Sequence, residues 1–531
     1  MTTAAEIIRQ GNKEKLWEKY CGYLDLDINQ YMQIQERLLL EEINIIKDSS
    51  LGRHFFGRKA PKSIDEFRRA VPVTTYEDYV DFLLEKNEDL LAPGNYRWAR
   101  TSGRSGKYPC KWVPYTEKIY EKLGEVVVGA ILLSSCKYKG DVTLEPGDVA
   151  LLATAPLPYT SGYISRATDD QLDIRFVPPL DAAEQMGFMD RITTGFSMAM
   201  DTGLDIFFGL ASVLGKMGER FEEGGSNGSF SLKMLKPRTL ARLLNGYLKA
   251  RLAKRPLLPR DIWKLKGIMT GGMDTDIYRK RIEYYWGRMP LEGYACTEGG
   301  MLGMQAWNFK GMTLFPDCNF YEFIPFDEHQ KIKDNPSYQP EVRLMNELEP
   351  GIYEFVFTNF YGGVLMRYRI GDLLEVISLE DDETGIRLPQ FRFYSRADDL
   401  IDLGSMARFT ETSIWKALDD SGVKYEDWTA RKERVDGQVL LHLYVELKDK
   451  ETRYFEQIES VVVEQMKQLH TDFADLEEIF GNGQFKISLL PKGAFNRYIE
   501  AQRAAGADLA HIKPPHMQPK DHIMKRLLQE G

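Results

Sequence analysis

The pattern of hydrophobic and polar positions in the first 58 residues is typical of helices. Apolar side chains between Leu38 and Ile46 gather on one flank, with charged residues interleaved. A helix-start signal follows at Ser63, a capping residue that precedes Glu66 by three positions. The pattern therefore predicts a helical start over residues 1–58 and a further helix that begins just after Ser63.

From about residue 95 onward, short apolar runs alternate with amphipathic stretches and glycine turns. Such alternation favours an α/β domain with parallel strand pairing. Two apolar runs separated by glycines further predict a hairpin. The predicted strands are 149–152, 174–177, 290–294, 351–359 and 363–370, and the predicted helices are 239–254 and 276–286.

The pattern changes again after residue 396. Residues 438–447 alternate strictly and predict a strand, 452–469 predict a helix, and 485–490 predict another strand. These predicted strands and this helix indicate a small α+β domain of about 130 residues. The expected fold class is therefore α/β, with a large N-terminal domain of mixed sheets and helices over 1–397 and a small C-terminal domain over 398–531.

Composition and charge exclude some classes of protein. The chain has 531 residues, 43% of them hydrophobic, which is enough for more than one core. A formal charge of −10 argues against a general nucleic-acid binder, which needs a basic face. A basic cluster at Lys249, Arg251, Lys254 and Arg255 is either a local patch or an ordinary solvated helix face.

Cysteine use and hydropathy predict a cytoplasmic protein without a membrane segment. The five cysteines are odd in number and form no CxxC pair, which suits a reducing compartment and indicates no thiolate metal site. The most apolar run, 126–133, is far shorter than the roughly 20 residues of a membrane span and predicts a buried strand or helix segment. We take a monomer as the default state.

The first candidate for chemistry is the stretch 101–107, which combines hydroxyls, glycines and cations and is followed by Lys111. Small residues let backbone N–H groups approach an anion, and hydroxyls and cations can bind phosphate oxygens. The stretch is not a Walker A loop, because only two residues separate Gly103 from Gly106 and Tyr108 follows the lysine. A phosphate-binding loop and an ordinary polar turn both remain open.

The second candidate joins two predicted strand ends. Gly271 and Gly272 follow one strand, Tyr294 ends the next, and Thr297 and Glu298 come just after it. An aromatic ring beside small residues can stack on a nucleotide base. A hydroxyl followed by a carboxylate can contact phosphate and hold Mg²⁺. The alternative is a strand end with a solvated glutamate.

Two further candidates lie nearer the C-terminus. Asp372 follows a glycine at a predicted strand end, where its carboxylate could accept hydrogen bonds from ribose hydroxyls. Lys513 lies on a polar, proline-rich tail and could serve as a mobile point charge for a phosphate. A surface aspartate and a solvated lysine are the alternatives.

Taken in order, these segments resemble the adenylate-forming superfamily of acyl-CoA synthetases, peptide-synthetase adenylation domains and luciferases. Within it, the chain is similar to the auxin-responsive promoter family of acyl acid–amido synthetases, including its bacterial members. The likeness covers nearly the whole chain. The segments that carry it are 101–107, 294–298, 368–372, 393–401 with Gly404 and Glu411, 493–495 and 506–507, and then Lys513.

The resemblance implies roles for the first group of positions. Thr101, Ser102, Gly103 and Ser105 would line the loop that handles the ATP phosphates, although Arg104 stands where the family often has threonine. Ser102 is one of three expected catalytic residues.

For the nucleotide, the resemblance implies that Tyr294 stacks on adenine and that Thr297 reaches the α-phosphate. Glu298, the second catalytic residue, would help to hold Mg²⁺. Asp372 would bind the ribose hydroxyls, with Arg396 near them.

The resemblance also implies a hinge at Asp398 and Asp399, about which the small domain rotates. Lys513 would be the third catalytic residue, the tail lysine that enters the site during adenylation. The sequence around it departs from the family pattern, and Lys492 and Lys520 are the alternatives.

The activity implied by the resemblance uses ATP and Mg²⁺ and has two steps. A small carboxylic acid is activated as an acyl-adenylate, and the acyl group then passes to an amino acid or another amine. The competing hypotheses are an acyl-CoA ligase with the same first step and a non-catalytic nucleotide-binding protein. Nucleic acid and membrane are not among the expected partners.

Overall fold

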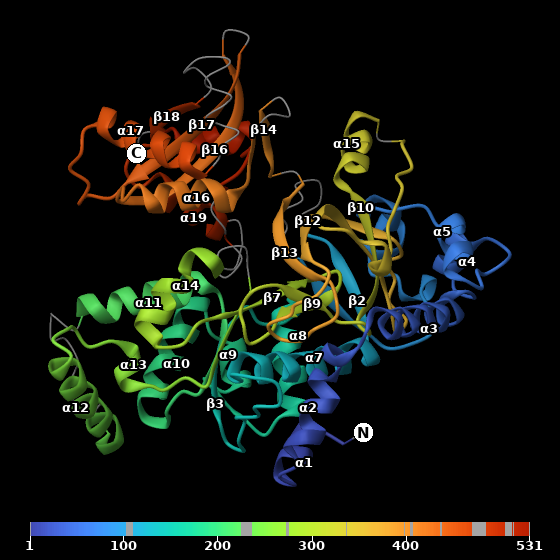
Figure 1. Ribbon diagram of the computed structural model, residues 1–531, viewed down its shortest axis with the longest axis horizontal. Helices are drawn as coiled ribbons and strands as arrows, with labels where there is room; N and C mark the ends of the chain where they lie inside the picture. Colours follow the sequence, from blue (N-terminus) through green and yellow to red (C-terminus); the bar gives the residue numbers. More distant parts are fainter. Residues whose placement is uncertain are drawn as a thin grey trace. The chain divides into compact units, whose positions relative to one another are not determined.

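The computed structural model confirms the helical start of the chain (Figure 1). Side chains cap these helices: Thr3, Asn12, Asp27 and Ser49 each accept a hydrogen bond from a first-turn N–H. The helices are α1 (Ala4–Arg9), α2 (Lys13–Cys21), α3 (Ile28–Ile46) and α4 (Ser50–Phe56). The structure describes residues 2–101, 110–224, 236–271, 275–335, 337–397, 399–403, 407–435, 438–469, 485–504, 512 and 515–529.

The predicted helix start at Ser63 is also confirmed. The Ser63 hydroxyl accepts a hydrogen bond of 3.1 Å from the Glu66 backbone N–H, and α5 (Ile64–Ala70) follows. The short α6 (Val80–Leu83) comes next.

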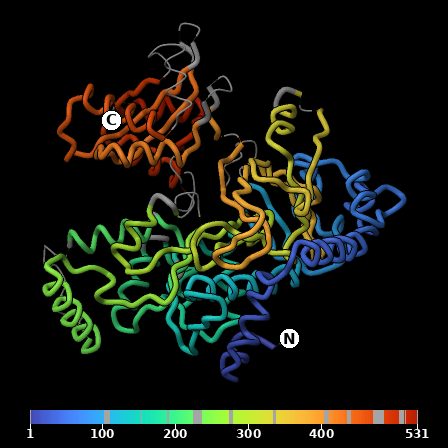
Figure 2. The backbone as a smooth tube through the Cα atoms, viewed as in Figure 1, coloured from blue at the N-terminus to red at the C-terminus, as the bar shows by residue number. Residues whose placement is uncertain are grey.

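Helix α3 is attached to the central sheet through its buried face. The Gln35 side chain donates to the carbonyl of Asn319 at 2.7 Å and accepts from the N–H of Tyr321 at 2.9 Å. These contacts place the start of the chain beside a strand nearly 300 positions later, as Figure 2 shows. A buried glutamine that satisfies strand groups in this way fixes the helix in register on the sheet.

Eleven strands of the described chain form one mixed sheet, as the sequence predicted. The strand order is β10-β11-β12-β13-β9-β8-β7-β6-β5-β3-β4. Strands β4, β3, β5, β6 and β7 are parallel, whereas β7, β8 and β9 pair antiparallel. The parallel half comprises β3 (Val149–Ala153), β4 (Arg175–Val177), β5 (Ile206–Gly209), β6 (Gly267–Gly271) and β7 (Leu291–Cys296). The rest comprises β8 (Gly300–Gln305), β9 (Met312–Leu314), β10 (Asn319–Pro325), β11 (Gly351–Asn359), β12 (Tyr368–Ser378) and β13 (Gln390–Arg396), and β1 (Tyr96–Arg100) pairs separately with β2 (Trp112–Thr116).

The predicted hairpin differs from the structure at its second strand, which begins at Tyr368 rather than at 363. The segment before it is held by side chains. The guanidinium of Arg367 makes two hydrogen bonds of 3.0 Å to the carboxylate of Glu322, and the backbone N–H of Arg367 donates to the hydroxyl of Thr358. Because side chains pair with the hydrogen-bonding groups of this segment, it does not need a neighbouring strand.

The apolar run 126–133 lies in a helix, α7 (Glu117–Ser135), which packs against α2, α8 and the sheet. Two glycines permit this close packing. A Cβ at Gly124 would lie 2.4 Å from the carbonyl oxygen of Ala167 on α8, and one at Gly129 would lie 2.6 Å from that of Tyr20 on α2. The other helices of this part are α8 (Thr160–Gln171), α9 (Leu180–Glu184), α10 (Phe188–Thr202), α11 (Ala211–Gly224), α12 (Pro237–Leu252), α13 (Pro259–Ile262), α14 (Thr275–Trp286) and α15 (Phe326–Asp334).

The chain divides into two compact units. The larger comprises Met1–Ile370 and Leu374–Phe393, and the smaller comprises Gly371–Leu373 and Tyr394–Gly531. The boundary between residues 397 and 398 stays a prediction, as does rotation about a hinge.

The smaller unit has the α+β composition that the sequence predicted, with its own core around Trp428, Leu441 and Val462. Its sheet has the order β16-β17-β18, with an antiparallel and then a parallel pair. Its elements are β14 (Ile401–Leu403), β15 (Ala407–Phe409), α16 (Glu411–Asp420), β16 (Tyr425–Val435), β17 (Gln438–Leu447), α17 (Phe455–Leu469), β18 (Phe485–Leu489), α19 (Ala494–Ala504) and α20 (Asp521–Leu527).

Candidate active site

The carboxyl ends of the parallel strands β3, β5, β6 and β7 meet at one edge of the large sheet. In sheets of this kind, ligands bind outside that edge. Strand β5 ends in Gly209, where a Cβ would lie only 2.6 Å from that of Ala153. Strand β6 ends in Gly271, where a Cβ would meet no atom of the described residues within 4 Å. Among the described residues, the edge is therefore more tightly packed at Gly209 than at Gly271.

Lys111, Glu298 and Tyr368 form a polar cluster at this part of the large unit. The Lys111 ammonium lies 3.4 Å from Oε1 of Glu298 and donates to the Tyr368 hydroxyl at 3.0 Å. That hydroxyl donates to the same carboxylate oxygen at 3.4 Å. Burial and the negative charge of Glu298 raise the pKa of Tyr368, which keeps its hydroxyl protonated and able to donate.

The cluster is largely shielded from solvent. The exposed fractions of the Lys111 and Glu298 side chains are 16% and 8%. Opposite charges interact more strongly in such surroundings than in water, and a negatively charged ligand would meet the ammonium with little water between them.

Backbone hydrogen bonds hold Lys111 opposite Thr101. The Thr101 N–H donates to the Lys111 carbonyl at 3.0 Å, and the Lys111 N–H donates to the Thr101 hydroxyl at 2.9 Å. The two ends of the candidate phosphate loop are thereby joined. Of its predicted binding residues, Ser102, Gly103 and Ser105 lie outside the described residues.

The turn that carries Thr297 and Glu298 is held from two sides. The Tyr115 hydroxyl donates to the Thr297 carbonyl at 2.5 Å, and the Asn359 amide donates to the Glu298 carbonyl at 3.0 Å. Sequence reasoning assigned no function to Tyr115 or Asn359, because each contacts the turn through a partner remote in sequence. The feature that the two residues share in the sequence is a position at or near the end of a strand.

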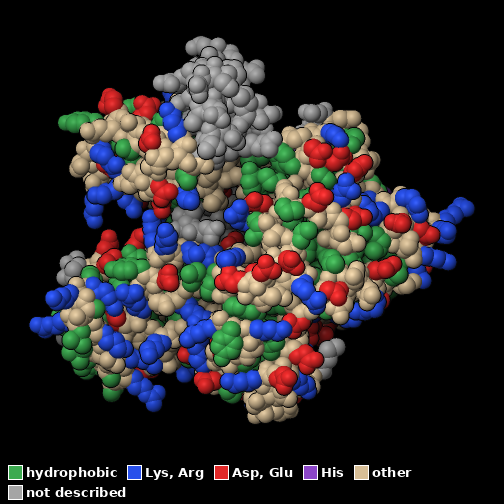
Figure 3. All heavy atoms as spheres, in the orientation of Figure 1, with side chains coloured by type: hydrophobic (Ala, Val, Ile, Leu, Met, Phe, Trp, Pro, Cys, Tyr) green, Lys and Arg blue, Asp and Glu red, His purple; other side chains and the backbone are tan. Residues whose placement is uncertain are grey.

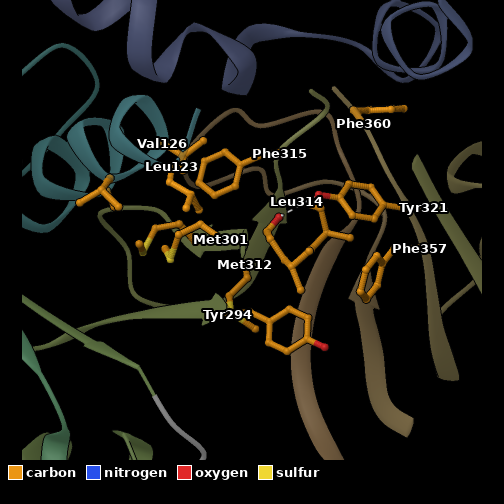
Figure 4. Close-up of a cluster of buried hydrophobic side chains, with 14 of the residues drawn as sticks. Leu123, Val126, Tyr294, Met301, Met312, Leu314, Phe315, Tyr321, Phe357 and Phe360 are labelled. Carbon is orange, nitrogen blue, oxygen red and sulfur yellow. Dashed lines mark hydrogen bonds between the residues drawn. The ribbon is translucent and has the colours of Figure 1, made fainter. Parts of the chain in front are cut away.

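Tyr294 is buried, with 7% of its surface exposed. Its ring packs edge-on against Phe355 at 5.6 Å between centroids and lies 6.2 Å from Phe393. Figure 4 shows it among buried apolar side chains that include Met312. This packing fixes the ring at the end of β7, and its stacking on adenine stays a prediction.

In the smaller unit, Asp372 and Arg396 form an ion pair of 3.0 Å, so the structure brings these two predicted residues together. The Asp372 side chain is 7% exposed, and that of Arg396 is 36% exposed. Gly371 precedes the aspartate with a φ of +80°, a conformation that favours glycine. The Ala397 N–H donates to the Gly371 carbonyl at 2.8 Å and ties the two segments together.

Several predicted residues lie outside the described part of the chain, namely Gly272, Asp398 and Lys513. Of the alternative tail lysines, Lys492 pairs with Asp449 at 2.7 Å on the surface, and Lys520 precedes α20 as its N-cap residue.

The described residues hold no group of three or more His, Cys, Asp or Glu side chains that could bind a metal by themselves. Glu298 alone supplies a carboxylate in the Lys111 cluster. Mg²⁺ commonly takes one or two protein carboxylates and completes its shell with substrate phosphates and water. The donor set therefore fits Mg²⁺ that arrives with a nucleotide.

The fold is similar to that of two solved structures over most of both chains. It is similar to the AtGH3.15 acyl acid amido synthetase in complex with 2,4-DB, with a TM-score of 0.66 and 19% identity over 98% of this chain and 95% of that one. It is also similar to 2-hydroxyisobutyryl-CoA ligase in the postadenylation state, with a TM-score of 0.60 and 14% identity over 94% and 91% of the two chains.

Two domains of the GH3 family match parts of this chain, which confirms the resemblance seen in its motifs. The GH3 family N-terminal domain matches residues 23–162, and the GH3 family central domain matches residues 312–396. Indole-3-acetic acid-amido synthetase GH3.17 of Arabidopsis thaliana is 30% identical over 27% of this chain. The probable indole-3-acetic acid-amido synthetase GH3.1 of Oryza sativa subsp. japonica is 24% identical over 49% of it. The matched stretches span 26% and 43% of these two relatives.

Proposed function

We propose that the protein is an ATP-dependent acyl acid–amido synthetase. The observation that carries the proposal is the shielded cluster of Lys111, Glu298 and Tyr368 beside the closed ends of the candidate phosphate loop. The matches to two GH3 family domains support it, since the curated relatives are named as amido synthetases.

In the first step, a carboxylate oxygen of the acid attacks the α-phosphorus of ATP, and the bond to pyrophosphate breaks. Two anions must approach each other, so cations and oriented donors carry most of the catalysis. Lys111 and the Tyr368 hydroxyl supply a buried cation and a donor. Thr101, Ser102, Gly103 and Ser105 are proposed to hold the phosphates.

Bound Mg²⁺, held by Glu298, would offset the negative charge of the phosphates. Lys513 is proposed to bring a second cation to the reaction from the tail. Asp372 would accept hydrogen bonds from the ribose, and Tyr294 and Gly271 would adjoin the base.

In the second step, the nitrogen of an amine attacks the acyl carbon, the bond from that carbon to the AMP oxygen breaks, and the amine loses a proton. No covalent bond to the enzyme is needed. We propose an amino acid as the acceptor, and rotation of the small domain about Asp398 and Asp399 between the steps.

The acid is proposed to bind between two segments, 153–166, which follows β3, and 202–208, which leads into β5. Both contribute apolar and aromatic side chains, which suits an aromatic or aliphatic acid. We propose that the enzyme works in the cytoplasm as a monomer.

A screen of carboxylic acids against the twenty amino acids tests the proposal, with pyrophosphate release and mass spectrometry as readouts. Amide formation with release of AMP and pyrophosphate supports it. Thioester formation with coenzyme A, but no amide, would indicate the acyl-CoA ligase instead. Binding of ATP without pyrophosphate release for every acid would favour the non-catalytic protein.

A further inference from the structure

Helix α12 exposes a continuous apolar face on the large unit. Five large side chains of this helix are between 43% and 85% exposed: Leu240, Leu244, Tyr247, Leu248 and Leu252. With about 100° between successive residues, they fall within an arc of about 140°. The helix is attached to the large unit by its other side, where Thr239, Gly246 and Ala250 are buried.

The same segment is strongly basic in an acidic protein. From Lys236 to Arg260 it has eight Lys and Arg residues and no Asp or Glu, whereas the whole chain carries −10. Some of these cations have partners: Lys236 pairs with Asp201 and Arg255 with Asp261. Arg238, Lys249, Arg251 and Lys254 are exposed and form no ion pair with any described residue. Figure 3 shows hydrophobic and basic side chains together where Figure 1 places α12.

Cations border one flank of the apolar arc and its start. By the helical geometry, Arg238 and Lys249 border one flank and Arg251 lies within the arc, while Lys236 directly precedes the helix as its N-cap. Helices that lie in a membrane interface show this pattern: leucine and tyrosine occupy one face, and long basic side chains border it. The stems of Lys and Arg can then follow the apolar surface while their charges reach lipid phosphates.

We propose that α12 docks the protein on the surface of an anionic lipid bilayer, with the helix parallel to the membrane plane. No helix of the described chain is long and apolar enough to cross a membrane. The 16 residues of α12 extend about 24 Å, less than the hydrocarbon thickness of about 30 Å, so the helix lies on the bilayer.

Charge decides between a bilayer and a second copy of the chain. Two copies paired through this face would bring two sets of unneutralised cations together, which opposes association. An anionic bilayer instead neutralises the cations with its lipid headgroups, and the leucines insert among its acyl chains.

Co-sedimentation of the full chain with vesicles tests the proposal. We expect binding to phosphatidylcholine vesicles with about 30% phosphatidylserine, little binding to phosphatidylcholine alone, and weakening by salt. Leu244→Glu with Leu248→Glu should lower the bound fraction by about tenfold or more. Lys249→Gln with Lys254→Gln should weaken binding by about fivefold for each charge removed.

The matched control is Leu379→Glu with Tyr454→Glu, which alters exposed apolar side chains elsewhere and should bind like the wild type. Circular dichroism and thermal unfolding check that the α12 variants are folded. The proposal is overturned if the wild type does not bind the anionic vesicles, or if the α12 and control variants bind alike. Concentration-dependent dimers or capture of an acidic protein through α12, without vesicle binding, would also overturn it.

Discussion

The ammonium of Lys111 lies 3.4 Å from Oε1 of Glu298, although 187 positions separate the two residues in the sequence. The sheet produces this proximity, because Glu298 follows β7 and Lys111 precedes β2, whose Tyr115 contacts the same turn. When a cation and a carboxylate share a shielded site, the cation can contact a phosphate while the carboxylate holds the metal ion bound to that phosphate.

This pair gives the first prediction. Glu298→Gln keeps the size of the side chain and removes its charge, so pyrophosphate release should fall by roughly a hundredfold to a thousandfold. A partial recovery at high Mg²⁺ would follow from a weakened metal site. Glu349→Gln, at an exposed carboxylate, is the control. Unchanged pyrophosphate release in Glu298→Gln would contradict the assigned function of the cluster.

The second prediction concerns the ion pair of Asp372 with Arg396. Asp372→Ala removes the proposed acceptor of the ribose hydroxyls and should raise KM for ATP by about tenfold or more, because hydrogen bonds to a charged group are lost. Initial rates of pyrophosphate release against ATP concentration measure this. The control is Glu375→Ala. Glu375 lies on the same strand as Asp372 and pairs with Arg392 of the next strand, so its loss should leave KM for ATP near the wild-type value.

The third prediction separates the candidate tail lysines. Lys513→Ala should reduce acyl-adenylate formation roughly a hundredfold or more, whereas reaction of a supplied acyl-adenylate with the amine should be less affected. Lys492→Ala and Lys520→Ala are the matched controls. Normal pyrophosphate release in Lys513→Ala would refute the assignment, and loss in one of the others would transfer it.

The fourth prediction is a pH dependence in the smaller unit. His516 is buried, stacks on Trp428 with 4.5 Å between ring centroids, and hydrogen-bonds to Glu411 at 2.6 Å and to Asp427 at 2.7 Å. Burial alone would lower its pKa, but the two carboxylates outweigh burial and raise the pKa of His516 to about 9. The imidazolium therefore ties the segment around residue 516 to α16 and β16.

The direction of the pH dependence follows from the coupling between proton binding and folding. The pKa is higher in the folded than in the unfolded chain, so this stabilisation is fully present below about pH 6.5 and is lost as the pH rises through about 9. It amounts to about 3 kcal/mol at most. Urea unfolding between pH 6 and 10, in steps of about one unit, should show His516→Asn far less stable than the wild type at pH 6, with a difference that shrinks above about pH 6.5 and is nearly gone above about pH 9. A difference that does not change with pH, or an equal effect of the exposed control His522→Asn, would contradict the prediction.

Local pattern was sufficient for many elements. Strict alternation over 438–447 predicted β17 with its observed bounds, and the Ser63 capping signal predicted the start of α5. Both signals are contained in a short stretch of sequence: the alternation spans ten residues, and the capping contact joins residues three apart. The run 126–133 could not be resolved in the same way, because a segment buried on all sides has no polar face to reveal its period.

The sequence by itself determined the order of the motifs, the α/β and α+β composition of the two parts, and the identity of Glu298 and Asp372 as candidates. Only the tertiary structure decided which residues meet. The described partners of Glu298 include Lys111, Tyr368 and Asn359, which come from three separate segments of the chain. Such contacts depend on strand order and register across the sheet, and these are set by long-range packing that no local pattern records.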